Sequence, residues 1–364
     1  MKKITNKVLW IFAVGQFGWS LLSGIISSWM VYYYTGEGAV FGSAITAKPL
    51  FLSVTLFGLI TAVGRLFDAV TDPLIAGWSD ASSFKGGRRI PFMKVIAIPF
   101  AVITVGVFAF PATGNVIVND VILFITLMLF YLFMTIYCTP YNALIAELGD
   151  TQKNRINVST YISFTYIAGL SVAYLLPNLA GLFTASLGAA NAVRLAIAIL
   201  AAVAAIAMLV PSFFIRERDY IHSEPVKTKA FSSLFKSFRN KQFRRFVYSD
   251  VIYFFAVTLF QTGLAFYITR LMHASESNTF LLTVVMTVVS LCLYPVVNRL
   301  APKLGKKKII IVGFFAYAAV FLVASLCREG LWWGYLIAVL AGIPMAILGI
   351  LPQAVVADIA EADA

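Results

Sequence analysis

The chain has 364 residues, of which 60% are hydrophobic and only 12% are charged, and its mean hydropathy is +0.89. Soluble proteins have about 45–50% apolar and about 25% charged residues, so this composition excludes a soluble domain and indicates a polytopic membrane protein. The net charge of +12 is also seen in nucleic-acid-binding proteins, but its distribution along the chain gives it another meaning.

Ten apolar stretches are long enough to cross a bilayer, whose hydrocarbon core requires about 20 helical residues. The first is too long for the apolar part of a signal peptide and lacks a small-residue cleavage site, so we expect it to remain as a helix. The predicted spans are residues 8–34, 50–79, 91–112, 119–148, 157–185, 190–215, 246–272, 277–300, 308–327 and 331–358.

Basic residues are concentrated in every second connection between the predicted spans. Nearly all of the 28 Lys and Arg residues lie before the first span or after spans two, four, six and eight, and the opposite side has only Lys48, Arg194, Arg270 and Arg328. By the positive-inside rule, the basic connections and both termini are predicted to be cytoplasmic. The excess of Lys and Arg therefore reflects the membrane topology, and we expect no nucleic-acid partner.

The second predicted span contains Arg65, Asp68 and Asp72. Charges at that depth cost roughly 2.5–3.5 kcal/mol each on insertion scales, and they usually mark an ion or substrate path. Asp68 and Asp72 are four residues apart and share a helix face, and Arg65, one turn earlier, can neutralise one of them. Pro73 leaves the carbonyl of Ala69 without its helical partner, so this carbonyl can face an ion. The pattern predicts a site for Na⁺ or H⁺; the alternative is a structural ion-pair network that locks two helices together.

The longest polar connection divides the chain. We predict a six-helix bundle over residues 1–215, a basic cytoplasmic loop over 216–245 and a second bundle of about four helices over 246–364. Within the loop, apolar residues at helical spacing alternate with basic ones and predict an amphipathic helix on the anionic inner leaflet; the alternative is a docking site for a soluble partner. The apolar residues are Phe231, Leu234, Phe235 and Phe238, and the basic ones are Lys236, Arg239 and Lys241.

The two halves carry an internal repeat. YPVVNRLAPKLGKKK (294–308) loosely repeats DPLIAGWSDASSFKGGRR (72–89), and LPQAVVADIAEAD (351–363) repeats PYNALIAELGD (140–150). The eighth predicted helix therefore corresponds to the second, and the tenth to the fourth. If each half has six helices, the last two of twelve are expected to follow the tenth.

Three segments of the chain are distinctive: GRLFDAVTDPLIAGWSD with GGRRIPF, YYYTG at 32–36, and PYNALIAELGDTQKNR at 140–155. They resemble the glycoside–pentoside–hexuronide:cation symporter family of the major facilitator superfamily. The resemblance implies an all-α fold of two pseudo-symmetric bundles that works by alternating access. It also implies symport of a sugar or glycoside with Na⁺ or H⁺, by a monomer in the bacterial inner membrane, with no cofactor and no structural metal besides the coupling ion.

The resemblance assigns roles to individual residues. Asp68 and Asp72 match the family's cation-binding aspartates, Arg65 matches the neighbouring arginine, and Thr135 is expected to add an oxygen from the fourth helix. Hard cations prefer such oxygen ligands. The cation half of the family's pattern is therefore present.

The sugar half of the pattern differs. Ser20, Cys138 and Ile162 stand where the pattern has two aspartates and an arginine, and Asn142 replaces an aromatic residue. The substrate-cavity candidates are Trp19, Ser20, Cys138, Asn142 and Gln261. A polar cavity lined by Trp19, Ser20, Asn142 and Gln261 would favour a sugar, whereas a lateral opening lined by Phe and Leu would favour a lysolipid or another amphiphile.

An enzyme is the remaining alternative. The D-x-x-x-D spacing also occurs in intramembrane prenyltransferases, which hold Mg²⁺ and a diphosphate between two acidic motifs. Here the other acids of the spans, Glu147, Asp250 and Asp358, lie at helix ends, so the sequence predicts a transporter and no enzyme.

The loop after the second span carries Asp80, Arg88 and Arg89, in the position of the superfamily's cytoplasmic signature. We expect these charges to pair with Glu147 or Arg155 and to hold an inward gate closed. The alternative is a solvated loop whose charges only set topology.

Overall fold

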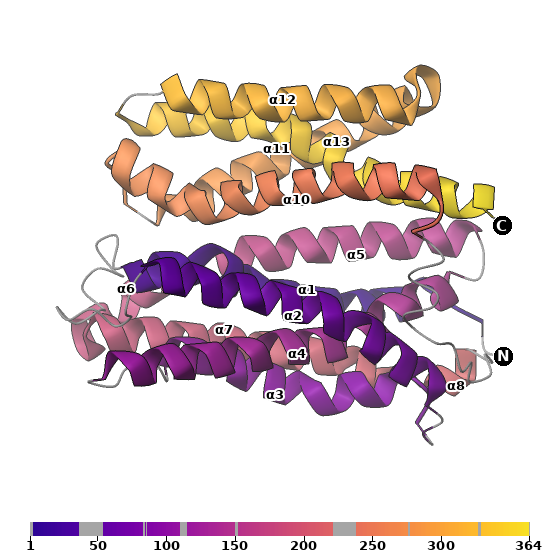
Figure 1. The fold of residues 1–364 in the computed structure, drawn as a ribbon, viewed down its shortest axis with the longest axis horizontal. Coiled ribbons are helices and arrows are strands. Elements are labelled where there is room, and N and C mark those ends of the chain that lie inside the picture. The colour runs from indigo at the N-terminus through magenta and orange to yellow at the C-terminus, as the bar shows by residue number, and fades with distance from the viewer. Residues whose placement is uncertain are drawn as a thin grey trace. The chain divides into compact units, whose positions relative to one another are not determined.

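The computed structural model describes residues 3–35, 54–82, 84, 86–109, 115–149, 152–220, 238–275, 277–326 and 329–363. These residues form helices, and the only β-pairing among them is an isolated bridge between Phe84 and Gly87. The helices are α1 (Asn6–Thr35), α2 (Val54–Ala81), α3 (Ile90–Ala109), α4 (Val116–Leu148), α5 (Gln152–Ala173), α6 (Leu176–Leu187), α7 (Ala189–Phe214), α8 (Glu217–Tyr220), α10 (Lys241–Phe266), the π-helix η1 (Tyr267–Leu271), α11 (Asn278–Leu304), α12 (Lys306–Leu326) and α13 (Leu331–Asp363) (Figure 1).

Nine helical segments of the described chain are long and apolar enough to cross a membrane. The remaining predicted span is α2, which is not among the nine; its 28 residues extend over about 42 Å at 1.5 Å per residue, which exceeds the thickness of a bilayer core. The predicted all-α membrane fold is confirmed.

Two spans differ in detail from the prediction. The single helix expected over 157–185 is two helices, because Pro177 lies in the first turn of α6, where proline is tolerated, and would clash within a continuous helix. The span expected from residue 246 starts at Lys241, because Asn240 caps it: its Oδ1 accepts from the amides of Gln242 (2.8 Å) and Phe243 (3.2 Å).

That cap also affects the predicted amphipathic helix. Lys241, which we expected on the amphipathic helix, is the first residue of α10, and Phe238 lies in a turn just before it. The other apolar positions expected on that helix lie outside the described residues.

The described residues form two compact units, one within 1–26 and 43–234 and the other within 27–42 and 235–364. In the first unit α2 packs on α4, α3 packs on both α4 and α7, and α6 packs on α7. Tyrosines on α4 tie it to its neighbours: the Tyr141 hydroxyl donates to the Phe12 carbonyl on α1, and the Tyr137 hydroxyl donates to the Met208 carbonyl on α7, both at 2.9 Å.

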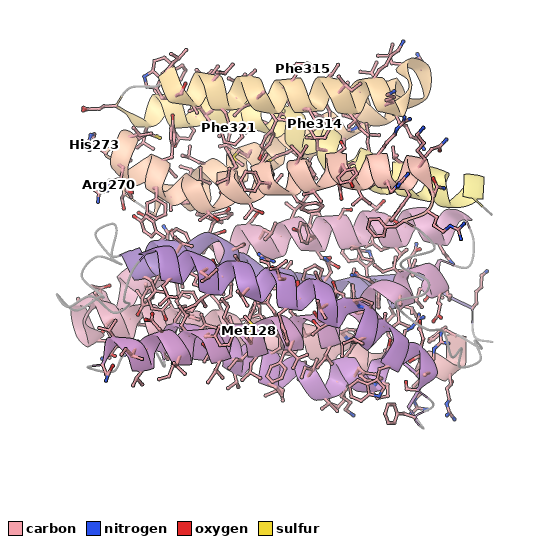
Figure 2. The ribbon with its side chains drawn as sticks, viewed as in Figure 1. Met128, Arg270, His273, Phe314, Phe315 and Phe321 are labelled. Carbon is pink, nitrogen blue, oxygen red and sulfur yellow. The ribbon has the colours of Figure 1, made fainter. Side chains whose placement is uncertain are left out.

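In the second unit α11 and α12 both pack on α13. This order matches the repeat, since α2 and α3 both pack on α4 in the first unit. Phe314, Tyr317 and Phe321 of α12, with Tyr253 of α10, line an apolar groove of about 370 Å³, whereas Phe315 points away from it (Figure 2).

Candidate cation site and cytoplasmic ion-pair cluster

The helices α2 and α4 run parallel in a constant register. The Thr135 hydroxyl donates to Asp68 Oδ1 at 2.6 Å, and the Thr139 hydroxyl donates to Asp72 Oδ1 at 3.2 Å; each pair is separated by 67 residues. Because residues four apart share a helix face, two carboxylates on α2 face two hydroxyls on α4. The structure thus brings together three predicted cation ligands, Asp68, Asp72 and Thr135.

Thr139 was not predicted. Its signal was present in the sequence, since Thr139 follows Thr135 by the same four residues by which Asp72 follows Asp68. Thr135 is almost fully buried, whereas Asp72 is exposed. These four side chains offer oxygen atoms, and Asp72 is open to solvent, an arrangement that suits a hard cation.

Arg65 has a different partner from the one expected. Its guanidinium lies over the ring of Tyr131, 5.0 Å from the centroid, and no ion pair of the described residues joins it to Asp68 or Asp72. Helical side chains lean toward the helix N-terminus, which places the Arg65 side chain near the turn that Tyr131 faces. Gly64 allows this contact, because a Cβ there would lie 2.5 Å from the Tyr131 ring.

The substrate-cavity candidates have separate environments. Ser20 is fully buried beside Gly169 of α5, and its hydroxyl donates to the Phe17 carbonyl at 3.1 Å, so it opens on no cavity in this structure. Trp19 is partly buried with its ring 5.9 Å from that of Tyr166.

The other candidates divide between α4 and α10. Cys138 is partly buried and Asn142 is exposed, both on α4. The side chain of Gln261 lies outside the described residues.

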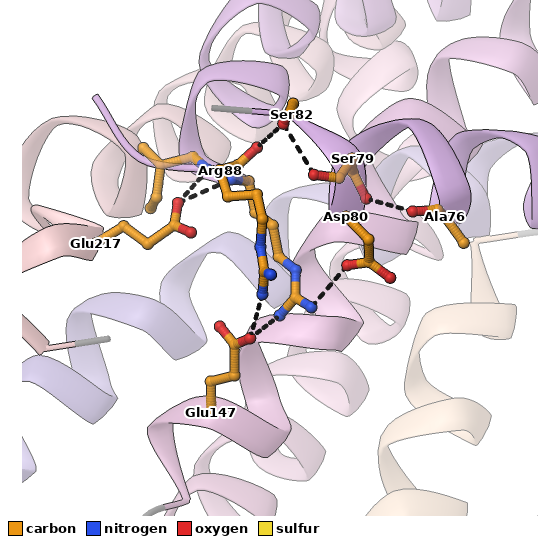
Figure 3. Close-up of polar contacts among 9 residues, drawn as sticks. Ala76, Ser79, Asp80, Ser82, Arg88, Glu147 and Glu217 are labelled. Carbon is orange, nitrogen blue, oxygen red and sulfur yellow. Dashed lines mark hydrogen bonds and ion pairs between the residues drawn. The ribbon is translucent and has the colours of Figure 1, made fainter. Parts of the chain in front are cut away.

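About two turns beyond Asp72 on the same face of α2 lies Asp80, and Glu147 lies two turns beyond Thr139 on α4. Arg88 and Arg89 lie in the connection just before α3. Arg88 pairs with Glu147 at 2.6 Å, and Arg89 pairs with Asp80 at 2.9 Å and with Glu147 at 2.9 Å (Figure 3). Asp80 and Glu147 have the same register as the two threonine–aspartate pairs. The structure therefore brings four of the five gate candidates together; the side chain of Arg155 lies outside the described residues.

A fifth member of this cluster, Glu217 of α8, was not predicted. It is buried, and its Oε2 accepts from the backbone amides of Arg89 (2.8 Å) and Ile90 (3.0 Å). No local pattern in the sequence marks this residue, because its partners are more than 120 positions away along the chain.

Comparison with known proteins identifies the family. The model of the family described as "MFS/sugar transport protein" matches residues 11–364. The chain is 25% identical over 315 residues to the uncharacterized symporter YnaJ of Bacillus subtilis, covering 85% of this chain and 64% of that protein. It is 23% identical to the isoprimeverose transporter of Lactiplantibacillus pentosus (83% and 60%) and 22% identical to the sodium-dependent lysophosphatidylcholine symporter 1 of Xenopus tropicalis (86% and 65%).

Solved structures share the fold. A bacterial homologue of the human lysosomal transporter Spinster superposes with a TM-score of 0.62 at 17% identity, over 96% of this chain and 74% of that chain. The D-xylose-proton symporter gives a TM-score of 0.59 at 15% identity (96% and 81%). The chain spans less than two thirds of the length of the curated relatives named above.

Proposed function

This chain belongs to the MFS/sugar transport family, and within the major facilitator superfamily to the glycoside–pentoside–hexuronide:cation symporters, and from this membership we propose that it is a cation-coupled sugar or glycoside symporter. The coupling ion, Na⁺ or H⁺, moves down its own gradient and thereby drives accumulation of the solute, and the protein needs no cofactor. We place it as a monomer in the bacterial inner membrane with both termini cytoplasmic.

The observation that carries this proposal is the pair of aspartate–threonine contacts between α2 and α4. Two carboxylates one helical turn apart repel each other where the dielectric constant is low, so at least one of them needs a proton, a metal ion or a cationic partner. Arg65 instead lies over Tyr131. A bound cation is therefore the natural partner of Asp68 and Asp72, with hydroxyl oxygens from Thr135 and Thr139 completing its ligands.

Coupling then follows from linkage. An ion that pulls Asp68 and Asp72 together changes how α2 packs on α4, and α2 also carries Asp80 of the ion-pair cluster. If ion binding raises the affinity for the solute, solute binding raises the affinity for the ion by the same factor. We propose that the cluster of Arg88, Arg89, Asp80 and Glu147 is the cytoplasmic gate.

Uptake by vesicles tests the proposal. Radiolabelled sugars are offered to vesicles that contain the protein, under a Na⁺ gradient, a proton gradient, or neither. We expect accumulation of a sugar or glycoside under one of the two gradients and only equilibration without them. Accumulation that survives collapse of both gradients would show that the transporter is not a symporter.

A second candidate solute is a lysolipid or another amphiphile. One observation favours it: a relative of similar coverage is a lysophosphatidylcholine symporter. The uncharged side chains of Ser20 and Cys138, which stand where the family's sugar-binding pattern has charged ones, are compatible with either solute. The same vesicles, offered a fluorescent lysophosphatidylcholine and the sugar panel in parallel, separate the candidates, because only one class should accumulate under the gradient.

A further inference from the structure

Glu217 is a buried acid, 4% exposed, that connects two distant segments of the chain. It is the first residue of α8, three positions after the end of α7, and its Oε2 accepts from the amides of Arg89 and Ile90 at the start of α3 (Figure 3). The first amides of a helix have no acceptor within the helix, and a carboxylate there also interacts favourably with the helix dipole. Glu217 thus caps α3 from outside its own sequence.

The loop before α3 is built around this carboxylate. Gly87 has φ +121°, a region that favours glycine, and a Cβ added there would lie 2.4 Å from Glu217 Oε2. The Arg218 guanidinium donates to the Phe84 carbonyl at 3.0 Å, so residues 217 and 218 both hold the loop backbone.

Arg88 and Arg89, whose side-chain charges belong to the gate, lie in this same loop. The backbone at Arg89 is fixed by Glu217, and the guanidinium groups of Arg88 and Arg89 meet Glu147 and Asp80 at 2.6–2.9 Å. Buried ion pairs stabilise a contact only when their geometry is good, because desolvation offsets their attraction. A shift of this backbone would therefore weaken the ion pairs themselves.

We propose that Glu217 is a positioning residue of the cytoplasmic gate: by capping α3 it sets the arginine side chains against Glu147 and Asp80. The segment that follows α7 thereby controls how firmly the gate closes. This inference rests on the proposed gate, and its test is arranged so that the two fail separately.

Cys138 provides a native reporter, because it is partly exposed on α4 between Thr135 and Thr139, at the level of the cation site and more than two turns from Glu147. With Cys292 and Cys327 replaced by serine, the labelling rate of Cys138 by a membrane-impermeant maleimide in inside-out vesicles measures access from the cytoplasmic side. Glu217→Gln keeps the shape of the side chain and removes its charge. We expect it to raise the labelling rate per folded molecule by about fivefold or more, since hydrogen bonds to charged groups contribute more than neutral ones.

Two reference variants calibrate the result. Glu147→Gln, within the gate, should raise the rate at least as much, whereas Asp219→Asn removes a negative charge from the same short helix and should leave it unchanged. If Glu217→Gln does not fold, Glu217→Asp, which only shortens the side chain, carries the same prediction. A cap without a role at the gate would lower the yield of folded protein without changing the labelling rate of each molecule.

Gly87→Ala gives an independent route to the same effect, because its new methyl group displaces the carboxylate. Alanine at Gly87 is also strained by its φ of +121°, which lowers the yield of folded protein in either background. In a double-mutant cycle, Gly87→Ala should raise the labelling rate per folded molecule in the native background and add little to that rate in Glu217→Ala. Additive effects would overturn the inference. An increase with Glu147→Gln but not with Glu217→Gln, Glu217→Asp or Glu217→Ala would overturn the inference and leave the gate standing. No increase with Glu147→Gln or with any Glu217 variant would overturn both.

Discussion

The α2–α4 pair and the α11–α13 pair occupy equivalent places in the repeat but differ in chemistry. When the prolines that mark the repeat are aligned (Pro73 with Pro295, and Pro140 with Pro352), the residues just before them are Asp72 and Thr139 in one pair and Tyr294 and Leu351 in the other. One turn earlier, Asp68 and Thr135 correspond to Ser290 and Ile347. Ile347 and Leu351 lie in an apolar cluster of the second unit, against which Tyr294 packs.

The difference between the two helix pairs indicates why α2 carries Asp68 and Asp72. Both pairs pack extensively, so two helices of this repeat associate without carboxylates between them. Carboxylates within a membrane span are costly. The second unit therefore argues against a network whose only purpose is to lock α2 to α4, and it favours ion binding as the reason for Asp68 and Asp72.

The largest effect on transport is expected from substituting the two aspartates of α2, and the equivalent position of α11 serves for comparison. In a chain that transports, Asp68→Asn and Asp72→Asn should each lower cation-driven accumulation by about tenfold or more, since each removes a charge from a site that needs both. Tyr294→Phe, at the position equivalent to Asp72, should change it little. Accumulation on an ion gradient is the measurement, and exchange of preloaded solute is the control, which the aspartate variants should partly retain. If both aspartate variants still accumulate solute, the pair is structural.

Substitutions at the equivalent positions Leu351 and Thr139 test the comparison through thermal stability. Leu351→Asn puts an amide into the apolar cluster of the second unit, and because an unsatisfied buried polar group costs about 1–3 kcal/mol, in addition to the packing that is lost, the thermal midpoint in detergent should fall clearly. Thr139→Leu, the matching change in the first unit, replaces a partly buried hydroxyl and should leave the midpoint within a degree or two. A similar loss in both variants would mean that the two pairs are packed alike.

Much of this comparison was visible in the sequence, because charges within an apolar span and prolines at repeated positions are local signals. Asp68, Asp72 and Thr135 were predicted from spacing and family pattern. The contact of Arg65 with Tyr131 and the cap by Glu217 could not be predicted. Each depends on how helices that are distant in the sequence lie next to one another in the fold. Ser20 shows a further limit: a polar residue in a span fits a cavity pattern, yet it is covered by α5 at Gly169.

A smaller effect is expected for Arg65→Gln. Arg65 is the cation nearest in sequence to the two carboxylates and lies over Tyr131, a contact worth about 0.5–2 kcal/mol. Its loss should slow the return of the empty carrier most, so net uptake should fall several-fold while exchange of internal for external solute is nearly unchanged. Arg65→Lys keeps the charge and should restore part of the net uptake. Equal losses of uptake and exchange would place Arg65 in the solute path instead.

The smallest effect should come from Thr139, whose hydroxyl donates to Asp72 at 3.2 Å, a longer bond than the 2.6 Å between Thr135 and Asp68. Thr139→Val removes the hydroxyl at nearly constant volume, and because one hydrogen bond to a charged group contributes about 1.5–3 kcal/mol when well formed, this longer one should change the half-saturating ion concentration by less than about tenfold. Thr139→Ser should restore the native value. Thr126→Val, on the same helix but with its hydroxyl bonded to the Ile122 carbonyl, is the control and should leave ion activation unchanged. Equal shifts in both valine variants would mean that Thr139 acts through packing of α4, and the α2–α4 pair would then supply only Thr135 as its hydroxyl ligand.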